Sequence, residues 1–391
     1  MVPPWGSPAA HGAVPGRVVV LGGGVVGAAC AWRLAGRGHR VVLVDPVPGG
    51  GASRAAAGML APVSELHHGE RELLELGLLA AAGFPRYVAD VERAAGGAPT
   101  GYRACGTLVV ALDAGDRARL ADVRRAQERL GLDVRALTGR ECRRLEPLLD
   151  PGVSGGTLVR GDHQVDPREL LRALRAAARD RGVEHVAETG EVLVEDGRAS
   201  GVRLAGGAVL RADLVVLATG ARAHPHAPVR PVKGQVLRLR MPPAGHLLTR
   251  TVRGVVRDRD VYLVPRRSGE LVVGATTEER GFDEAVTAGA VHDLLRDAQA
   301  LVPGVAELEL VEVLARSRPG SPDNLPLIGF GEVPGLLLAT GHHRNGVLLS
   351  GITADAVAAL AAGEDVPPEV AACDPGRFGS RTAAREEVRA R

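Results

Sequence analysis

Three glycines near the start of this 391-residue chain have a spacing that could bind a dinucleotide. Gly22, Gly24 and Gly27 form a G-x-G-x-x-G pattern, and Asp45 follows eighteen residues after Gly27. In such a pattern the first glycine allows a tight turn, the second lets the backbone approach a pyrophosphate, and the third lets a helix pack closely on a strand. The carboxylate of Asp45 could accept hydrogen bonds from a ribose hydroxyl. The pattern does not say which dinucleotide binds.

The chain beyond Asp45 is nearly free of bulky side chains. Small residues dominate Gly49–Ser53 and Ala55–Met59. Composition alone favours a flexible loop. The alternative is a backbone that lies close to a large planar ligand, which only small residues allow. A flavin ring beside the diphosphate would need such a path, whereas a nicotinamide would not need so long a one.

A second glycine-bounded loop, Gly341–Gly346, stands between an expected strand and an expected helix. The N-terminus of that helix could stabilise negative charge at the N1–C2=O end of a reduced flavin. Taken alone, the loop fits an ordinary strand-to-helix turn better.

A few polar side chains could bind an acidic substrate. Arg316 and Arg318 precede the loop SPDNLPLIG, and arginine can hold a carboxylate by two parallel hydrogen bonds. Because the chain is rich in arginine, residue type alone fits a solvated surface residue equally well. Tyr262, one of three tyrosines, likewise fits core packing with its hydroxyl at a rim.

The sequence does not contain the residue patterns expected for a metal site, a hydrolase or a set of disulfides. Six of the twelve histidines form close pairs without partners at metal-ligand spacing, so no metal site is predicted: His67 and His68, His224 and His226, His342 and His343. No G-x-S-x-G elbow or Cys/His pairing indicates a hydrolase. The cysteines lie far apart and are interpreted as reduced thiols: Cys30, Cys105, Cys142 and Cys373.

Elements of a doubly wound fold must position these residues. The pattern predicts buried strands at Val18–Leu21, Val41–Val44, Leu214–Leu217 and Leu336–Ala339, with helices at Ala28–Gly36, Asp166–Asp180 and Val347–Ala362. The strand at Leu214–Leu217 stops at Thr219 and Gly220, which brings this turn to the same sheet edge as the first glycine loop. Between Pro231 and Val313 the pattern changes to alternating strands at Val236–Arg240, Val261–Val264 and Leu271–Ala275.

We therefore expect an α/β protein with a discontinuous Rossmann-type dinucleotide-binding domain and a second, mostly antiparallel β substrate domain of α+β type. The expected boundaries are a disordered leader at 1–15, the dinucleotide-binding domain at 16–95, 155–228 and 317–372, the substrate domain at 96–154 and 229–316, and an Arg-rich tail at 373–391.

Composition excludes several classes of protein. The formal net charge is only +2, and the arginines are scattered among acids, so no nucleic-acid partner is expected. No apolar run reaches the length of a membrane span, and the N-terminus lacks a signal-peptide pattern. The sequence thus predicts a cytoplasmic protein with no membrane partner.

Several motifs together resemble one family. GGGVVGAACAWRLAGRGHRVVLVD followed by GGGASRAAAGMLAP resembles the amino-terminal signature of FAD-dependent amine oxidases of the D-amino-acid oxidase superfamily. PVKGQ, VYLVPR, VVGATTE, RPGSPDNLPLIG and ATGHHRNGVLLS narrow the resemblance to the glycine oxidases within it, over roughly residues 16–365.

The resemblance implies site residues by position. It assigns contacts with non-covalently bound FAD to Gly22, Gly24, Val25, Val26, Gly27, Asp45, Pro46, Ala52, Ser53, Ala57, Gly58, Met59, Val192, Thr219, Gly220, His342, His343, Arg344, Asn345, Gly346, Val347 and Leu348. It assigns the binding and orientation of the substrate carboxylate to Arg318 and Arg344, with Tyr262 helping to close the site. Asp45 stands where the family more often has Glu, and His343 where it usually has an aromatic residue.

The resemblance also implies a reaction. It is the oxidative deamination of glycine, with sarcosine and small D-amino acids as further candidate substrates, to the imine and glyoxylate, with O₂ reduced to H₂O₂. Hydride would pass from the substrate α-carbon to the flavin, and the dehydroglycine would supply thiazole synthesis for thiamine. A homo-oligomer, such as a tetramer, and a functional link to a thiazole synthase are further expectations.

Three alternatives stay open at this point. The chain could be a sarcosine oxidase-like enzyme or a D-amino-acid dehydrogenase that uses a quinone. It could be a non-catalytic FAD-binding subunit, or a dehydrogenase that binds only NAD.

Overall fold

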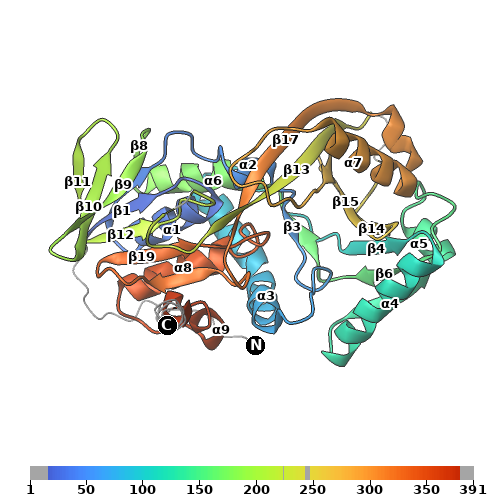
Figure 1. The fold of residues 1–391 in the computed structure, drawn as a ribbon, viewed down its shortest axis with the longest axis horizontal. Coiled ribbons are helices and arrows are strands. Elements are labelled where there is room, and N and C mark those ends of the chain that lie inside the picture. The colour runs from blue at the N-terminus through green and yellow to red at the C-terminus, as the bar shows by residue number, and fades with distance from the viewer. Residues whose placement is uncertain (1–15, 223, 243–246, 379–391) are drawn as a thin grey trace, which may run out of the picture.

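The computed structural model describes residues 16–222, 224–242 and 247–378, which divide into two lobes (Figure 1). One lobe is built on a sheet with the strand order β18-β19-β12-β1-β2-β8. Adjacent strands in this sheet are parallel, except that β18 pairs with β19 in the antiparallel direction at one edge. The strands are β1 (Arg17–Leu21), β2 (Arg40–Val44), β8 (Glu184–Val186), β12 (Leu214–Leu217), β18 (Leu327–Phe330) and β19 (Leu336–Thr340).

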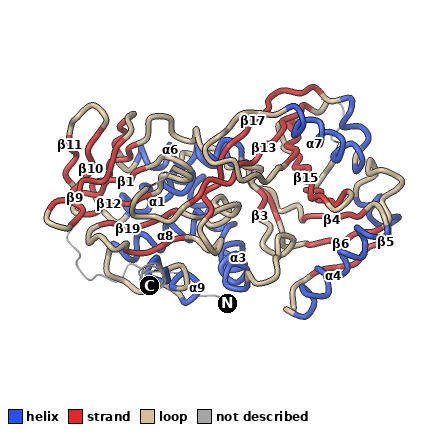
Figure 2. The backbone as a smooth tube through the Cα atoms, viewed as in Figure 1, coloured by secondary structure: helices blue, strands red, loops and turns tan. Residues whose placement is uncertain are grey.

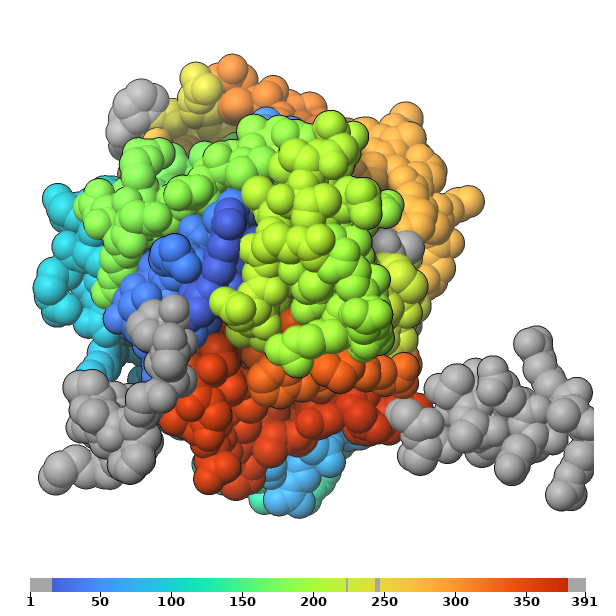
Figure 3. All heavy atoms as spheres, turned by 90° about the vertical axis from the view of Figure 1, so that its left-hand side faces the viewer, coloured from blue at the N-terminus to red at the C-terminus, as the bar shows by residue number. Residues whose placement is uncertain are grey.

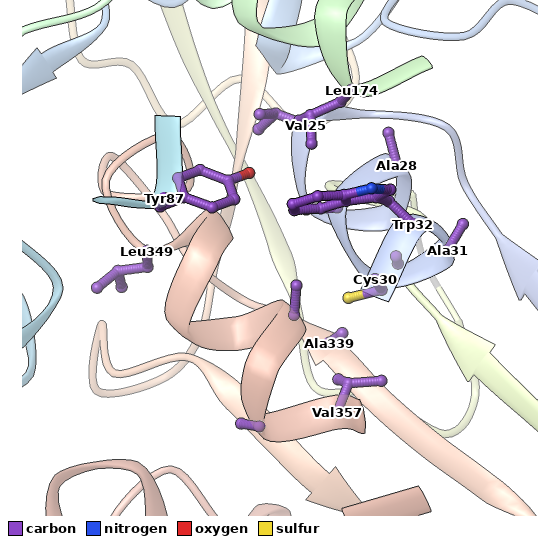
Figure 4. Close-up of a cluster of buried hydrophobic side chains, with 14 of the residues drawn as sticks. Val25, Ala28, Cys30, Ala31, Trp32, Tyr87, Leu174, Ala339, Leu349 and Val357 are labelled. Carbon is purple, nitrogen blue, oxygen red and sulfur yellow. The ribbon is translucent and has the colours of Figure 1, made fainter. Parts of the chain in front are cut away.

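The central strands of this sheet are runs of Val and Leu because both faces are covered. One face packs against the helices α1 (Val25–Gly36), α3 (Arg71–Ala94), α6 (Pro167–Asp180) and α8 (Ser350–Ala361). Figure 4 shows Trp32 of α1 near Tyr87 of α3, with their ring centroids 6.4 Å apart, among small and aliphatic side chains. These residues fix α1, and therefore the glycine turn before it, on the sheet.

The other face of the same sheet is covered by a small antiparallel sheet. It consists of β9 (Gly190–Glu195), β10 (Arg198–Leu204) and β11 (Val209–Arg211). In Figure 3 the blue N-terminal segment lies between green residues of this region and the red C-terminal segment. The lobe is thus assembled from parts of the chain that are far apart in sequence, as the discontinuous Rossmann-type prediction requires.

The second lobe is built on a mostly antiparallel sheet with the order β17-β13-β16-β15-β14-β4-β6-β5, in which only the β14–β4 pair is parallel among the described residues. The strands are β4 (Thr107–Ala111), β5 (Val134–Thr138), β6 (Gly155–Val159), β13 (Arg230–Arg240), β14 (Thr251–Val256), β15 (Arg259–Pro265), β16 (Glu270–Gly274) and β17 (Glu309–Gly320). The helices α4 (Ala114–Arg129), α5 (Gly139–Leu145) and α7 (Ala288–Leu301) belong to this lobe, and Figure 2 shows α4 and α7 at its outer edge.

Short elements join the lobes. They are α2 (Ala52–Ala55) and β3 (Met59–Leu60), which pairs with β7 (His163–Gln164). The 3₁₀ turn Pro303–Glu307 packs against α7 in the second lobe, and α9 (Pro368–Ala371) and the 3₁₀ turn Pro375–Phe378 pack against β18 in the first. The long strands β13 and β17 run between the two lobes in Figure 1. The predicted fold class, α/β with a second antiparallel β region, is confirmed.

Individual elements differ from their predictions. β6, inside the segment 155–228 assigned to the dinucleotide-binding domain, pairs with β4 and β5 in the second sheet. Two glycines begin this strand, and they carry no strand signal of their own. β17 is a strand where only a loop entry was expected, and its Pro319 is tolerated because β17 lies at the edge of the sheet.

A helix boundary also differs. α8 begins at Ser350, three residues after the predicted Val347. Hydrogen-bonded turns fill the difference, since Leu349 N–H donates to Asn345 C=O at 2.9 Å.

The predicted leader at 1–15 and most of the predicted tail, residues 379–391, lie outside the described residues. Residues 375–378 of that tail form a 3₁₀ turn. Within the described ranges, no helix is both long enough and apolar enough to cross a membrane.

Candidate active site

A cavity of about 940 Å³ lies where the carboxyl ends of β1, β2 and β12 face β13, β15 and β17. This is large for a small-molecule site and fits an extended ligand. Most of the predicted site residues line it: Gly22, Gly24, Val25, Val26, Asp45, Pro46, Ala52, Ser53, Ala57, Gly58, Met59, Thr219, Gly220, Tyr262, Arg318, His342, His343, Arg344, Gly346 and Val347.

The first glycine turn has the close contacts that its pattern predicts. Gly22 has φ +101°, and a Cβ there would lie 2.2 Å from the carbonyl oxygen of Ala218. A Cβ at Gly27 would lie 1.9 Å from the carbonyl oxygen of Gly22. Gly27 therefore does not line the cavity; it allows α1 to approach the strand.

The N-terminus of α1 is open toward the cavity. Its cap residue Gly24 offers no side-chain hydrogen bond, and its first turn has no acidic residue. Ser53 accepts the Val25 N–H at 3.1 Å, which fixes the small-residue loop against the helix start. A helix N-terminus on a cavity wall, with a glycine as its cap residue and no acid in its first turn, suits the phosphates of a dinucleotide.

Asp45 is fixed at the end of β2 by two backbone amides. Its carboxylate accepts the N–H of Gly23 at 2.6 Å and that of Val47 at 2.8 Å. Beyond it, Glu188, Thr189 and Gly190 line the cavity. Val192, to which the resemblance assigned a contact with FAD, does not line this cavity, and its half-buried side chain packs against the core beside β10.

Buried hydrogen bonds order the small-residue segment. The Arg266 guanidinium, from the second lobe, donates to the Ala57 carbonyl and, at 2.8 Å, to the Val165 carbonyl. Val165 N–H in turn donates to the Gly58 carbonyl at 2.9 Å. Burial lowers the pKa of Arg266 to about 10, still far above neutrality, so the guanidinium stays charged. The segment is therefore a shaped wall and not the flexible loop that composition alone favours.

Arg318 presents a cation whose hydrogen bonds, in the described part of the chain, go only to backbone carbonyls. Its Nη1 donates to the carbonyl oxygens of Thr276 at 3.1 Å and Lys233 at 3.4 Å. A Cβ at Gly234 would lie 2.4 Å from this nitrogen, so glycine there gives the guanidinium its space. Among the residues that the structure describes, no acid lies within ion-pair distance of Arg318. It is suited to hold an incoming carboxylate.

Tyr262 stands on β15, close to Arg318. It is paired with Gly274 of β16, and a Cβ at Gly274 would lie 2.4 Å from the tyrosine hydroxyl. Burial raises the pKa of Tyr262, more than the nearby Arg318 charge lowers it. The phenol is therefore neutral and can donate a hydrogen bond into the cavity.

Arg344 differs from Arg318 because it is already paired. Its Nη2 donates to Glu70 Oε2 at 2.7 Å, and its Nε lies 3.6 Å from Glu65 Oε2. Arg344 lines the cavity, but two carboxylates share its charge. The two arginines predicted to bind the same substrate carboxylate therefore have unlike surroundings.

The two histidines of the second glycine loop are neutral. His342 is buried, with Nε2 2.9 Å from Thr353 Oγ1, and burial lowers its pKa to about 3. Burial, and then the charges of Arg344 and Arg318, lower the pKa of His343 to about 4. His343 N–H donates to the Pro319 carbonyl at 2.7 Å, which ties this loop to the end of β17.

Asn345 and Leu348 of the same loop lie beside the main cavity. They line a small neighbouring hollow together with Glu70 and Gly77. The loop Gly341–Gly346 and the residues after it therefore line both the main cavity and this small hollow.

Sequence reasoning missed several wall residues. Glu65, His67, Arg253, Asp260, Phe282 and Glu284 line the cavity, but none belongs to a recognisable motif. Arg316, which it did single out, donates from Nε to the Gly50 carbonyl at 2.8 Å and pairs with Glu284 at 3.3 Å. These residues come from separate loops and strands, so only the fold brings them together.

Comparisons with known proteins agree with this geometry. A family model described as FAD dependent oxidoreductase matches residues 17–360. The bifunctional protein ThiO/ThiG of Nostoc sp. is 35% identical over 357 residues, which cover 88% of this chain and 52% of that protein. The chain therefore spans about half the length of this relative.

Two other relatives match over nearly their whole length. The hydrogen cyanide synthase subunit HcnC of Pseudomonas aeruginosa is 33% identical over 94% of this chain and 97% of its own. The crystal structure of glycine oxidase from Geobacillus kaustophilus superimposes with a TM-score of 0.83 at 34% identity, covering 92% of this chain and 98% of that one.

Proposed function

The chain belongs to the family of FAD-dependent oxidoreductases, and from this premise we propose that it oxidises glycine and other small amines that carry a single carboxylate. The observation that carries the proposal is Arg318, an arginine without an acidic partner among the described residues, on the wall of the cavity beside neutral Tyr262. The glycine oxidase from Geobacillus kaustophilus supports this choice of substrate.

The wall of the cavity fits FAD. The open start of α1 suits the two phosphates, and the Asp45 carboxylate suits a ribose. The ordered small-residue segment, from Ala52 to Met59, leaves room for a large planar ring. FAD supplies the acceptor for two electrons, which no amino-acid side chain can do.

The residues of the chain bind and orient the substrate. Arg318 holds the carboxylate by charge-assisted hydrogen bonds, and Tyr262 donates a further hydrogen bond beside it. His342 and His343 are neutral at physiological pH, so they add no positive charge near the amine. Because the reaction needs the neutral amine and correct alignment, orientation provides much of the rate.

The net reaction converts glycine, O₂ and water to glyoxylate, ammonia and H₂O₂ through the imine. We further propose that the imine supplies thiazole synthesis for thiamine. The bifunctional protein ThiO/ThiG of Nostoc sp. supports this link, since it is a relative that carries two functions in one protein. Small D-amino acids and sarcosine are expected to be slower substrates of the same site.

Oxygen uptake by the purified holoprotein tests the proposal. Glycine, sarcosine and D-alanine are compared, with H₂O₂ and glyoxylate measured as products. Uptake with glycine supports the proposal. Reduction of the flavin without oxygen uptake would instead identify a dehydrogenase, and no reaction with any amine would identify a non-catalytic subunit.

A second candidate is a role as a subunit of a hydrogen cyanide synthase. The HcnC relative, matched over 97% of its length, favours it. Measuring cyanide and glyoxylate after glycine oxidation separates the two functions, because the oxidase releases glyoxylate and no cyanide.

A further inference from the structure

We propose that the Glu65–Arg253 ion pair determines substrate specificity by keeping a second carboxylate out of this site. The pair neutralises Arg253, a cation on the same cavity wall as Arg318. The site then admits amines with one carboxylate and rejects amines with two. This inference rests on the proposed function and defines its substrate class.

Arg253 lies beside the groups that face the substrate. It stands on β14 directly opposite Tyr262 on β15, so the two side chains are neighbours on one face of the sheet. Both line the cavity, together with Glu65 and Met59. Arg318 lines the same cavity, and the charges of Arg318, Glu65 and Arg253 all act on the pKa of the Tyr262 phenol.

Glu65 holds Arg253 closely. Arg253 Nη1 donates to Glu65 Oε1, and the two side chains are only 17% and 13% exposed. Burial alone would raise the pKa of Glu65, but the charges of Arg253 and Arg344 outweigh it and lower the pKa. The carboxylate is therefore ionised at neutral pH.

The backbone around Glu65 is fixed independently of this ion pair. Buried Asp162 accepts the N–H of Val63 at 3.2 Å and that of Ser64 at 2.6 Å. Gln127 donates to the Val63 carbonyl at 2.8 Å. A substrate would have to move an anchored carboxylate to reach Arg253.

Unlike Arg318, the arginines Arg253 and Arg344 at this end of the cavity are held by carboxylates. Arg253 pairs with Glu65, and Arg344 pairs with Glu70 and lies near Glu65. A single substrate carboxylate on Arg318 would neutralise its charge. A second one would lie near ionised Glu65 and meet repulsion, which is how a site rejects a close analogue of its ligand.

Propionate and succinate test the inference without turnover. They differ by one carboxylate, and isothermal titration calorimetry on the holoprotein measures both. Wild type should bind propionate at least about tenfold tighter than succinate. Glu65→Gln, which frees Arg253, should raise the affinity for succinate relative to propionate by about tenfold or more, since a new charge-assisted contact is worth at least that factor.

Two variants serve as controls. Glu65→Gln combined with Arg253→Met removes the freed cation and should lose the gain in succinate binding. Glu75→Gln makes the same chemical change on the exposed face of α3, where Glu75 pairs with Arg71, and should leave both affinities unchanged.

Three results would overturn the inference: equal binding of the two acids by wild type, a ratio within twofold of wild type in Glu65→Gln, or a gain that persists in the double variant. If Glu65→Gln does not fold, the wild-type comparison decides. Because neither acid is oxidised, a protein that discriminates between them but oxidises no amine would refute the proposed function and leave this inference standing.

Discussion

Replacing Arg318 with methionine should impair glycine oxidation far more than replacing Arg344 with methionine. Both arginines line the cavity, so the two variants make the same chemical change at two places on its wall. Arg318 donates only to two backbone carbonyls among the described residues, whereas Arg344 pairs with Glu70 and Glu65. The charge of Arg318 is therefore free for the substrate, and that of Arg344 is not.

The expected magnitude follows from these surroundings. Removing one partner of a buried, hydrogen-bonded charge pair costs about 2–5 kcal/mol. For Arg318→Met this corresponds to a loss of kcat/KM of about 30-fold to several thousand-fold, mostly as a rise in KM. Arg344→Met removes no direct anchor, so its loss should stay under about tenfold. Its main effect should be a lower Tm, because Glu70 and Glu65 lose a partner.

Steady-state oxygen uptake at varied glycine, normalised to bound FAD, measures both variants. The FAD content of each variant controls for a damaged cofactor site. The reasoning is refuted if Arg318→Met stays within threefold of wild type. It is equally refuted if Arg344→Met raises the KM as much as Arg318→Met does.

The other predictions concern the cofactor wall and its stability. Because burial lowers the pKa of His342 from 6.5 to about 3, its neutral form stabilises the fold above pH 6.5, and this contribution is lost as the pH falls below that value. At about pH 5 the free energy of unfolding should be lower by about 2 kcal/mol for this reason. The difference in unfolding free energy between about pH 7 and about pH 5, measured with denaturant, should therefore be smaller in His342→Gln than in wild type. An equal difference in the two proteins would contradict this origin. Arg316→Met removes the hydrogen bond to the Gly50 carbonyl and should weaken FAD binding about tenfold while leaving the KM for glycine within threefold, as measured by equilibrium dialysis and oxygen uptake. Gly27→Ala would place its Cβ 1.9 Å from the Gly22 carbonyl oxygen and should abolish FAD retention on purification, so a fully yellow variant would show that the close approach is not required.

The dinucleotide half of the site could be predicted from the sequence because its determinants are local. A strand, three spaced glycines, a helix and an acid follow one another within residues 17–45, and the structure places them as the pattern requires. The small residues after Asp45 indicated a flavin, and the chain's family uses FAD. Here each residue's role depends on near neighbours in the sequence.

The substrate half could be predicted only in part because its determinants are contacts over long sequence separations. The resemblance to glycine oxidases treated Arg318 and Arg344 alike, but Arg344 meets Glu70, which is 274 residues away in the chain. Arg253 and Glu65 are separated by 188 residues and carry no motif. Residue type and spacing report none of these pairings, so the charge balance of the site was visible only in the fold.

The most direct test of the central claim is the absorption spectrum of the purified holoprotein after anaerobic addition of glycine. The protein should be yellow, and its flavin band should bleach when glycine is added and return when air is admitted, with release of H₂O₂. A flavin band that glycine, sarcosine and D-alanine all leave unchanged would contradict it.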